Sequence, residues 1–508
     1  MKKLKKGLLI LLHVLTGLIF TIGCLIFQSS TWVHDVFGIQ FAELLYTMTS
    51  PLKGTGDGMV GKTLAGCLYP VIPTIIAYIL VIVFFACLLP KKVKAFLHVR
   101  IVKWKITFQP LRLIHIIAPV VAVWVFIASL YHADKMLGMF DYFELLDSKT
   151  TVYEEHFVDP DSVTLTAPET KKNLILIYLE SMETTYASVE DGGHQSVNYI
   201  PNMTQMAKEN ISFSNTEKLG GFRLTGKTSW TMAALFATSS GIPFSFPVDG
   251  NSMGEYEKFA SGVTSLGDIL QEEGYYNEFL CGSDVSFAGR KQYYEQHGYD
   301  DLYDLYTARE EGVIAPDYHV FWGFEDQILF EIAKKELTEL SQLDQPFNLT
   351  MITLDAHHTG GYVCDICGSD YDVPTANVIA CADRQLKDFI LWCQEQPFYE
   401  DTVIVMMGDH PRMDTFLVEG VARADRTMYN CIINSDTVTE SPLTNREFSS
   451  MDMFPTILAA MGYEIEGDRL GLGTNLFSDR KTLSEELGYQ YFDQELYKYS
   501  TYFAENFY

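Results

Sequence analysis

Three apolar runs of strand length each lead directly into residues that can bind a metal ion or move a proton. They are Leu174–Leu179 before Glu180 and Ser181, Leu349–Leu354 before Asp355, Ala356, His357 and His358, and Thr402–Met407 before Gly408, Asp409 and His410. In open α/β sheets ligands bind beyond the carboxyl ends of the strands, so these groups should meet at one edge. Carboxylate oxygens and imidazole nitrogens suit Mn²⁺, Zn²⁺ or Mg²⁺. Each motif alone is common in loops, but three at equivalent positions indicate a metal site.

A fourth motif offers a nucleophile. Gly226-Lys-Thr228-Ser229 is followed by Trp230-Thr231 and by the helical run Met232–Thr238. Thr228 would therefore lie near a helix N-terminus, where backbone N–H groups and the helix dipole favour an anion. A threonine hydroxyl becomes a useful nucleophile when a metal or a base lowers its pKa. The competing interpretation of Thr228 is an ordinary helix cap.

The same stretch matches a nucleotide-binding pattern. Gly221–Thr228 reads G-x-x-x-x-G-K-[ST], the P-loop signature. A P-loop joins a strand directly to a helix, whereas the strand candidate Ile211–Ser214 is separated from Gly221 by polar residues. The membrane topology argued below also places this segment outside the cell, where ATP is scarce. We therefore interpret the match as coincidental.

The elements around these motifs alternate between strand and helix. Helical patterns fall at Val263–Glu273, Glu325–Glu339 and Ala376–Gln394, between the apolar runs. Unbroken apolar strands separated by helices predict an α/β domain, with a largely parallel sheet covered on both faces. We assign this domain to residues 171–508.

The N-terminal part predicts a membrane anchor, residues 1–131. Gly7–Phe27, Leu64–Leu89 and Leu113–Tyr131 are long enough to span a bilayer, which takes roughly 20 residues. The first run is too long for a cleaved signal peptide. The intervening segment Pro90–Arg112 carries seven Lys or Arg and no acidic residue. The positive-inside rule then places the N-terminus in the cytoplasm and everything after about residue 132 outside.

Charge and cysteine usage narrow the function further. Residues 1–131 carry a net charge of +10 and residues 132–508 a net charge of −38, which argues against nucleic-acid binding. Residues 132–170 are polar and predict a linker, and Trp32–Met48 has the spacing of a helix on the membrane surface. For Cys364, Cys367 and Cys381 we favour a structural disulfide of unknown pairing over a zinc or redox site, because no second CxxC follows.

Together these motifs resemble the lipoteichoic acid synthase and phosphoglycerol transferase family, within the sulfatase and alkaline phosphatase superfamily. The resemblance covers about residues 170–480, in the right motif order, and includes Ser450–Thr456. Features that point to the phosphoglycerol transferase I branch are Trp230-Thr231, His357-His358, Ser286–Gly289, Pro51–Gly54 and three predicted spans. The C-x-P-x-R or S-x-P-x-R nucleophile motif of sulfatases is absent at the Thr228 position, so sulfate-ester hydrolysis is not expected.

The resemblance implies a specific chemistry. A divalent metal, Mn²⁺ or alternatively Mg²⁺, would be held by Glu180, Thr228, Asp409 and His410, and Thr228 would attack the phosphorus of phosphatidylglycerol. His357 and Arg290 would bind the substrate. A glycerophosphate group would then pass to an envelope glycan or teichoic acid-type acceptor. The alternatives are a phosphoethanolamine transferase, a phosphodiesterase, or an inactive membrane-anchored binding module.

Overall fold

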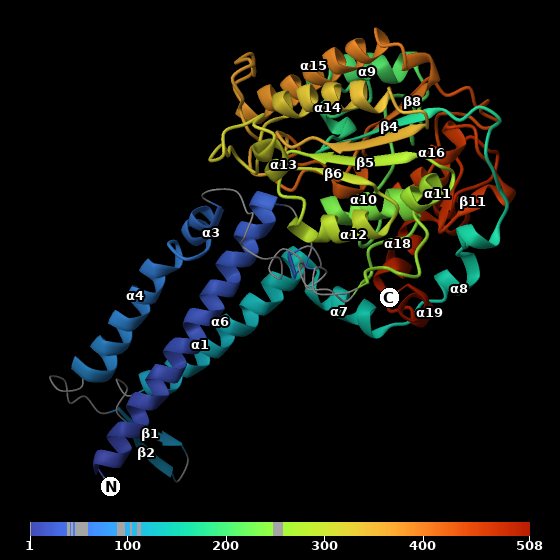
Figure 1. The fold of residues 1–508 in the computed structure, drawn as a ribbon. Coiled ribbons are helices and arrows are strands. Elements are labelled where there is room, and N and C mark those ends of the chain that lie inside the picture. Colours follow the sequence, from blue (N-terminus) through green and yellow to red (C-terminus); the bar gives the residue numbers. More distant parts are fainter. Residues whose placement is uncertain are drawn as a thin grey trace. The chain divides into compact units, whose positions relative to one another are not determined.

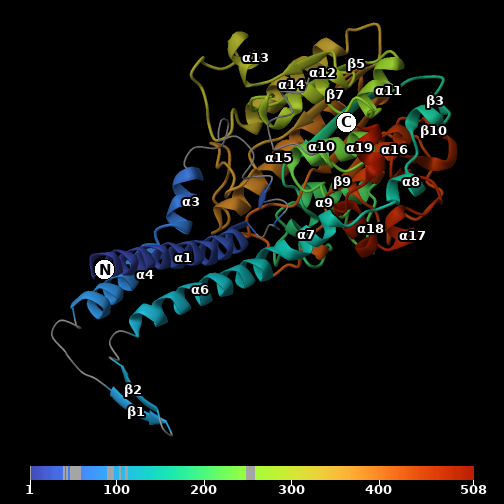
Figure 2. The same ribbon diagram turned by 90° about the horizontal axis from the view of Figure 1, so that it is seen from below.

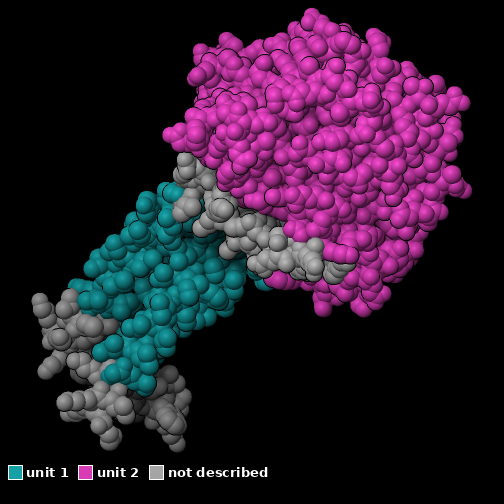
Figure 3. All heavy atoms as spheres, in the orientation of Figure 1, with its two compact units in different colours: residues 1–41, 57–141 teal, residues 42–56, 142–508 magenta. Residues whose placement is uncertain are grey.

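The computed structural model describes residues 2–507 except 38–40, 42–43, 46–58, 89–96, 102–103, 109–112 and 247–257. The chain divides into two compact units, which Figure 3 distinguishes by colour. One comprises residues 1–41 and 57–141, and the other comprises residues 42–56 and 142–508.

Two long apolar helices lie side by side in the first unit (Figures 1 and 2). They are α1 (Lys2–Phe37) and α6 (Ile114–Leu137). Gly23 lets the helices approach closely, because a Cβ there would lie 3.0 Å from the Cα of Phe126. Both helices are long and apolar enough to cross a membrane. The N-terminal unit therefore has the helices of a membrane anchor.

The middle one of the three predicted spans is broken. It consists of α3 (Met59–Cys67) and α4 (Val71–Ile82), bent by 40° at a short break, so that the pair counts as a third span only if both helices cross together. The predicted surface helix also differs, since Trp32–Phe37 simply continues α1. Most of the remainder of Trp32–Met48, and all of Pro51–Gly54, lie outside the described residues. The basic segment contains an antiparallel hairpin, β1 (Leu97–Ile101) and β2 (Trp104–Phe108).

The second unit is built on a six-stranded sheet with the strand order β6-β5-β7-β4-β8-β9. All neighbouring strands are parallel except β8 and β9. The predicted α/β class with a largely parallel sheet is thus confirmed. The strands are β4 (Asn173–Leu179), β5 (Tyr276–Cys281), β6 (Asp301–Tyr303), β7 (Phe347–Ile352), β8 (Thr402–Gly408) and β9 (Asn430–Ile433).

The central strand β4 shows why its sequence is apolar throughout. Leu174, Leu176 and Tyr178 pack into one hydrophobic core, and the alternate residues of the strand pack into a second core on the opposite face. Helices α10, α11, α12 and α16 cover the first face, and α9, α14 and α15 cover the second (Figure 1). Their bounds are α9 Pro201–Glu209, α10 Thr231–Ser240, α11 Leu266–Glu272, α12 Arg290–Gln296, α14 Asp326–Leu340, α15 Pro374–Gln394 and α16 Met453–Ala460.

The stretch predicted as a linker is largely structured. It contains α7 (Met139–Asp147) and α8 (Val152–His156), and Tyr153 of α8 is buried with its ring 5.4 Å from that of Phe503. Phe503 belongs to the C-terminal segment, which consists of α17 (Leu483–Leu487), α18 (Tyr489–Tyr497) and α19 (Thr501–Asn506). The domain boundary at residue 170 stays a prediction.

Candidate functional site

Two neighbouring strands bring the predicted acidic ligands together. Leu179 of β4 and Gly408 of β8 are paired in register, so the next residues, Glu180 and Asp409, leave the sheet side by side. The ligand atoms of Glu180, Asp409 and His410 all lie within 4.8 Å of one another, and all three side chains are buried. Nε2 of His410 lies 3.6 Å from Oε1 of Glu180 and 3.4 Å from Oδ2 of Asp409. We call these three residues the acidic cluster.

Local hydrogen bonds fix the orientation of this cluster. Nδ1 of His410 donates to the carbonyl oxygen of Pro411 at 2.9 Å, so the lone pair of the neutral ring is on Nε2, toward the carboxylates. Oδ1 of Asp409 accepts the N–H groups of Ser181 and His410. The Ser181 hydroxyl donates to Glu180 at 2.6 Å. Oδ2 of Asp409 is buried and has no hydrogen-bond partner.

The electrostatics of the cluster favour a bound cation. Burial, followed by the charge of Glu180, raises the pKa of Asp409 to about 7. Two buried carboxylates, one with an oxygen that lacks a partner, are unfavourable unless a positive charge compensates them. Two carboxylates and one imidazole nitrogen are a donor set that Mn²⁺, Mg²⁺ and Zn²⁺ accept. These residues therefore fit the divalent cation expected from the sequence.

The predicted nucleophile Thr228 and its neighbour Thr231 differ in their surroundings. Thr228 is fully buried, and its hydroxyl donates to the carbonyl oxygen of Thr225 at 2.8 Å. Thr231 is the first residue of α10, is only partly buried, and places its Oγ1 3.1 Å from Nε2 of His410. It also lines a cavity together with Glu180, which Thr228 does not. The hydroxyl beside the acidic cluster is therefore that of Thr231, three residues beyond the predicted nucleophile.

The Gly-Lys-Thr sequence before α10 forms a tight turn. The N–H of Thr225 donates back to the Thr228 hydroxyl at 3.1 Å, and Lys227 has a positive φ of 62°. A Cβ at Gly226 would lie 2.8 Å from the ring of Tyr497. Burial lowers the pKa of Lys227 to about 8, and its ammonium donates to the hydroxyl of Ser245. These contacts account for the P-loop letters without a nucleotide.

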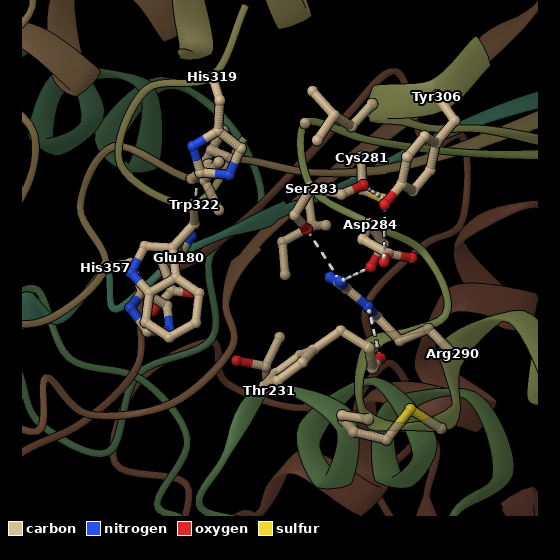
Figure 4. Close-up of a pocket in the computed structure, with 18 of the residues that line it drawn as sticks. Glu180, Thr231, Cys281, Ser283, Asp284, Arg290, Tyr306, His319, Trp322 and His357 are labelled. Carbon is tan, nitrogen blue, oxygen red and sulfur yellow. Dashed lines mark hydrogen bonds between the residues drawn. The ribbon is translucent and has the colours of Figure 1, made fainter. Parts of the chain in front are cut away.

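The two predicted substrate-binding residues line one cavity. Arg290 and His357 border a space of about 210 Å³ together with Glu180, Thr231 and Trp322 (Figure 4). Thr231 and Met232, the first two residues of α10, line this cavity, so the first N–H groups of the helix and its dipole favour an anion there. The cavity thus combines a cationic side chain, a helix N-terminus and a hydroxyl beside the acidic cluster. This combination suits a phosphate ester.

Arg290 is held firmly at the start of α12. Its guanidinium donates to the hydroxyl of Ser283 and to the carbonyl oxygen of Asp284, both at 2.8 Å. The side chain is buried except toward the cavity. A fixed guanidinium loses little conformational entropy when it binds an anion.

His357 is a neutral imidazole. Its Nδ1 donates to the carbonyl oxygen of His358 at 2.8 Å, and its ring lies 4.5 Å from that of Trp322. Burial lowers the pKa of His357 to about 4. Asp355, which the sequence predicts at the same edge of the sheet, is not part of the acidic cluster. Burial and the nearby Asp326 raise its pKa to about 10, so it is a neutral acid inside the protein.

Sequence reasoning missed a set of buried ion pairs behind the site. Arg412 makes two hydrogen bonds to Asp414, and Arg426 pairs with Glu183. The backbone N–H of Arg412 also donates to Glu183, and its guanidinium donates to the carbonyl oxygen of Ala356. The set therefore links the segments that follow β4, β7 and β8. Arg412 and Asp414 could have been found from the sequence, because they closely follow Gly408-Asp409-His410. No local pattern marks Arg426.

Comparisons with known proteins found a matching family model and several similar proteins. Residues 172–463 match the family model described as Sulfatase. Phosphoglycerol transferase I of Salmonella choleraesuis is 32% identical over 327 residues, which are 63% of this chain and 41% of that protein. Phosphoglycerol transferase I of Escherichia coli O127:H6 is 32% identical over 321 residues, 62% of this chain and 40% of that protein. The alignments thus span less than half of these relatives.

Two solved structures show a weaker similarity to this chain. The lipoteichoic acid synthase LtaP from Listeria monocytogenes has a TM-score of 0.49 at 19% identity, covering 62% of this chain and 79% of its own. The lipooligosaccharide phosphoethanolamine transferase A from Neisseria meningitidis has a TM-score of 0.47 at 15% identity, covering 89% of this chain and 84% of its own.

Proposed function

Because this chain belongs to the sulfatase family, we propose that it is a membrane-anchored transferase that moves glycerophosphate from phosphatidylglycerol to an envelope glycan or polyglycerophosphate acceptor. The observation that carries the proposal is the Thr231 hydroxyl, which lies at a helix N-terminus and 3.1 Å from Nε2 of His410, on a cavity that also holds Arg290. The names of the relatives favour a glycerophosphate group over other phosphate esters.

We assign the nucleophile to Thr231 and a structural role to Thr228. The proposed metal ligands are Glu180, Asp409 and His410. The hydroxyl of Thr231 would be the fourth ligand. A divalent cation bound there, Mn²⁺ or Mg²⁺, would lower the pKa of the hydroxyl and neutralise charge on the phosphoryl oxygens.

The reaction proceeds by two displacements. Oγ1 of Thr231 forms a bond to phosphorus as the bond from phosphorus to the diacylglycerol oxygen breaks. The proton lost by the hydroxyl is returned to that oxygen, so diacylglycerol leaves as an alcohol. Arg290 and the N-terminus of α10 hold the phosphate of the glycerophosphoryl-threonine. An acceptor hydroxyl then attacks phosphorus as the bond from phosphorus to Oγ1 of Thr231 breaks. The proton of the acceptor hydroxyl passes to Oγ1, which restores the threonine.

We assign His357 a proton-relay role in both steps, because it lines the same cavity as Thr231. Its Nδ1 is committed to the carbonyl oxygen of His358, which leaves the lone pair of the neutral ring on Nε2. A pKa near 4 keeps that lone pair available at neutral pH. The ring therefore accepts a proton only transiently and passes it to a departing oxygen.

The anchor and its orientation fit a lipid donor. We propose that the N-terminus is cytoplasmic and that the catalytic unit is extracytoplasmic, because Pro90–Arg112 is basic and lacks acidic residues. Tethering raises the effective concentration of the enzyme at a membrane lipid. The strongly acidic catalytic part, by contrast, has no attraction of its own for anionic headgroups.

Product analysis tests the proposal. The full chain in vesicles that contain phosphatidylglycerol labelled in the headgroup glycerol should release diacylglycerol and label an envelope acceptor fraction. Matched vesicles in which phosphatidylethanolamine is the labelled donor are the control. Faster turnover of phosphatidylethanolamine would make the chain a phosphoethanolamine transferase, and transfer only to water would make it a phosphodiesterase. No turnover of either lipid in the presence of Mn²⁺ or Mg²⁺ would leave a binding module.

A further inference from the structure

Three cysteines gather where the loop that follows β7 meets helix α15. Cys364 and Cys367 lie in the loop after His357, and Cys381 lies on α15. Their sulfur atoms all lie within 4.8 Å of one another, with 3.3 Å between Cys364 and Cys367 and 3.7 Å between Cys364 and Cys381. Cys364 and Cys381 are buried and Cys367 is half-buried. We call these three residues the cysteine cluster.

We propose that the cysteine cluster is a binding site for Zn²⁺, separate from the acidic cluster. Zinc binds thiolates at about 2.3 Å, so two sulfurs on one tetrahedral ion lie about 3.8 Å apart. The separations of 3.3 and 3.7 Å, with all three sulfurs within 4.8 Å of one another, are close to this spacing. Because Cys367 is only half-buried, a water molecule from solvent would be the fourth ligand.

The surroundings supply what a thiolate site needs. The backbone N–H of Ile366 donates to the sulfur of Cys364, and the side-chain amide of Gln385 donates to the sulfur of Cys381 at 3.4 Å. The positive charge of Arg384 also acts on Cys381. Such donors orient sulfur ligands and disperse their negative charge. Three thiolates and one Zn²⁺ carry a net charge of −1, which Arg384 offsets.

A zinc ion uses all three sulfurs, whereas a disulfide uses two. Cys364 is close to both of the others, so either pairing would leave a third thiol against the new bond. Thiol–disulfide exchange between such neighbours is facile in an oxidising compartment. The favoured disulfide of the sequence analysis is therefore the outcome that the test must distinguish.

A zinc ion at the cysteine cluster would connect the loop that follows His357 to helix α15. Between His357 and Cys364, Gly360 donates its N–H to Asp414 and accepts the hydroxyl of Thr375 on α15. Zinc would add a second connection to α15, a few residues further along the same loop. Thiolates prefer softer cations than carboxylates do, so the two sites differ in the metal that they select.

Metal and thiol analysis of the purified full chain tests the proposal without any substitution. We expect about one zinc per chain that resists mild chelation, and three alkylatable thiols at Cys364, Cys367 and Cys381 after denaturation with a chelator. Replacing zinc by Co²⁺ should produce sulfur-to-cobalt charge-transfer absorption. A peptide in which two of these cysteines are joined by a disulfide, in a chain without zinc, would overturn the proposal.

Two variants separate the cysteine cluster from the acidic cluster. Cys381→Ser should remove one equivalent of zinc and the cobalt absorption, and His410→Ala should leave both unchanged. Cys393→Ser is the matched control, because Cys393 is a buried cysteine on the same helix, and it should retain the zinc. Equal zinc content in the Cys381 variant and the wild type would refute the assignment. Cobalt absorption lost in the His410 variant would do so as well.

Discussion

Substitutions of Thr228, before α10, and Thr231, at its start, are expected to have opposite effects on turnover and stability. Thr231→Ala removes the hydroxyl that lies 3.1 Å from Nε2 of His410 and opens no buried hydrogen-bonded turn. Loss of a covalent nucleophile lowers turnover by about 10³-fold or more, which corresponds to about 4 kcal/mol of transition-state stabilisation. Thermal stability should be nearly unchanged. Thr231→Ser, which keeps a hydroxyl at the same atom, should restore a measurable part of the rate.

Thr228→Val should show the reverse pattern. It removes the hydroxyl that accepts the N–H of Thr225 at 3.1 Å and donates to its carbonyl oxygen at 2.8 Å in a fully buried turn. Leaving such a group without its partner costs about 1–3 kcal/mol of folding free energy. Turnover at a temperature where the variant is folded should stay within about tenfold of wild type, since each factor of ten equals about 1.4 kcal/mol of barrier.

The assay follows diacylglycerol release from labelled phosphatidylglycerol, with the unfolding midpoint measured on the same preparations. Acid quenching during turnover, followed by peptide mass analysis, should locate a glycerophosphoryl group on Thr231. An adduct on Thr228 would refute the reasoning, and so would full turnover by Thr231→Ala. A Thr228→Val protein that is inactive yet as stable as wild type would also return the nucleophile to Thr228.

Three further substitutions probe the rest of the site. Asp409→Asn should stabilise the metal-free protein, and more so at pH 8 than at pH 5. Because the pKa of Asp409 is raised in the folded state, the wild type loses stability as pH rises from about 4 to 7, whereas Asn does not titrate. Unfolding measured in a chelator at both pH values tests this, and an equal effect at both would contradict it. His357→Gln should lower turnover by about 10²-fold or more without changing bound metal, as expected for a proton relay; unchanged turnover would exclude that role. Arg290→Lys should raise KM for phosphatidylglycerol, because lysine lacks the planar fork of donors; an unchanged KM would show that the guanidinium does not hold the phosphate.

Much of the fold could be predicted because its core strands are apolar without interruption. The runs at Leu174–Leu179 and Thr402–Met407 correspond to β4 and β8, and helix α15 begins within two residues of its predicted start. Strands β5 and β6 were not predicted, since Tyr276–Cys281 contains Asn277 and Glu278. Both of these polar residues are buried, so periodicity alone does not mark the strand.

The candidate site divides along a similar line. Glu180, Asp409 and His410 could be found because strand pairing alone brings the ends of β4 and β8 together. The choice between Thr228 and Thr231 depends on where the helix begins, and helix starts are uncertain by one or two residues in sequence and structure alike. Thr228 lies three residues before the first residue of the helix, in the buried turn that its own hydroxyl closes.

The buried ion pairs behind the site are explained better by positioning than by stability. A buried pair such as Arg412 with Asp414 contributes little net folding energy, because desolvation offsets most of the attraction between the charges. Yet Arg412 also holds the carbonyl oxygen of Ala356, next to His357, and Asp414 holds the N–H of Gly360. The same pair therefore fixes the loop that carries the imidazole to the segment that follows His410. Apolar residues of equal volume would fill the space but could not hydrogen-bond either backbone group, so we assign the charged pair the role of fixing the geometry of the cavity.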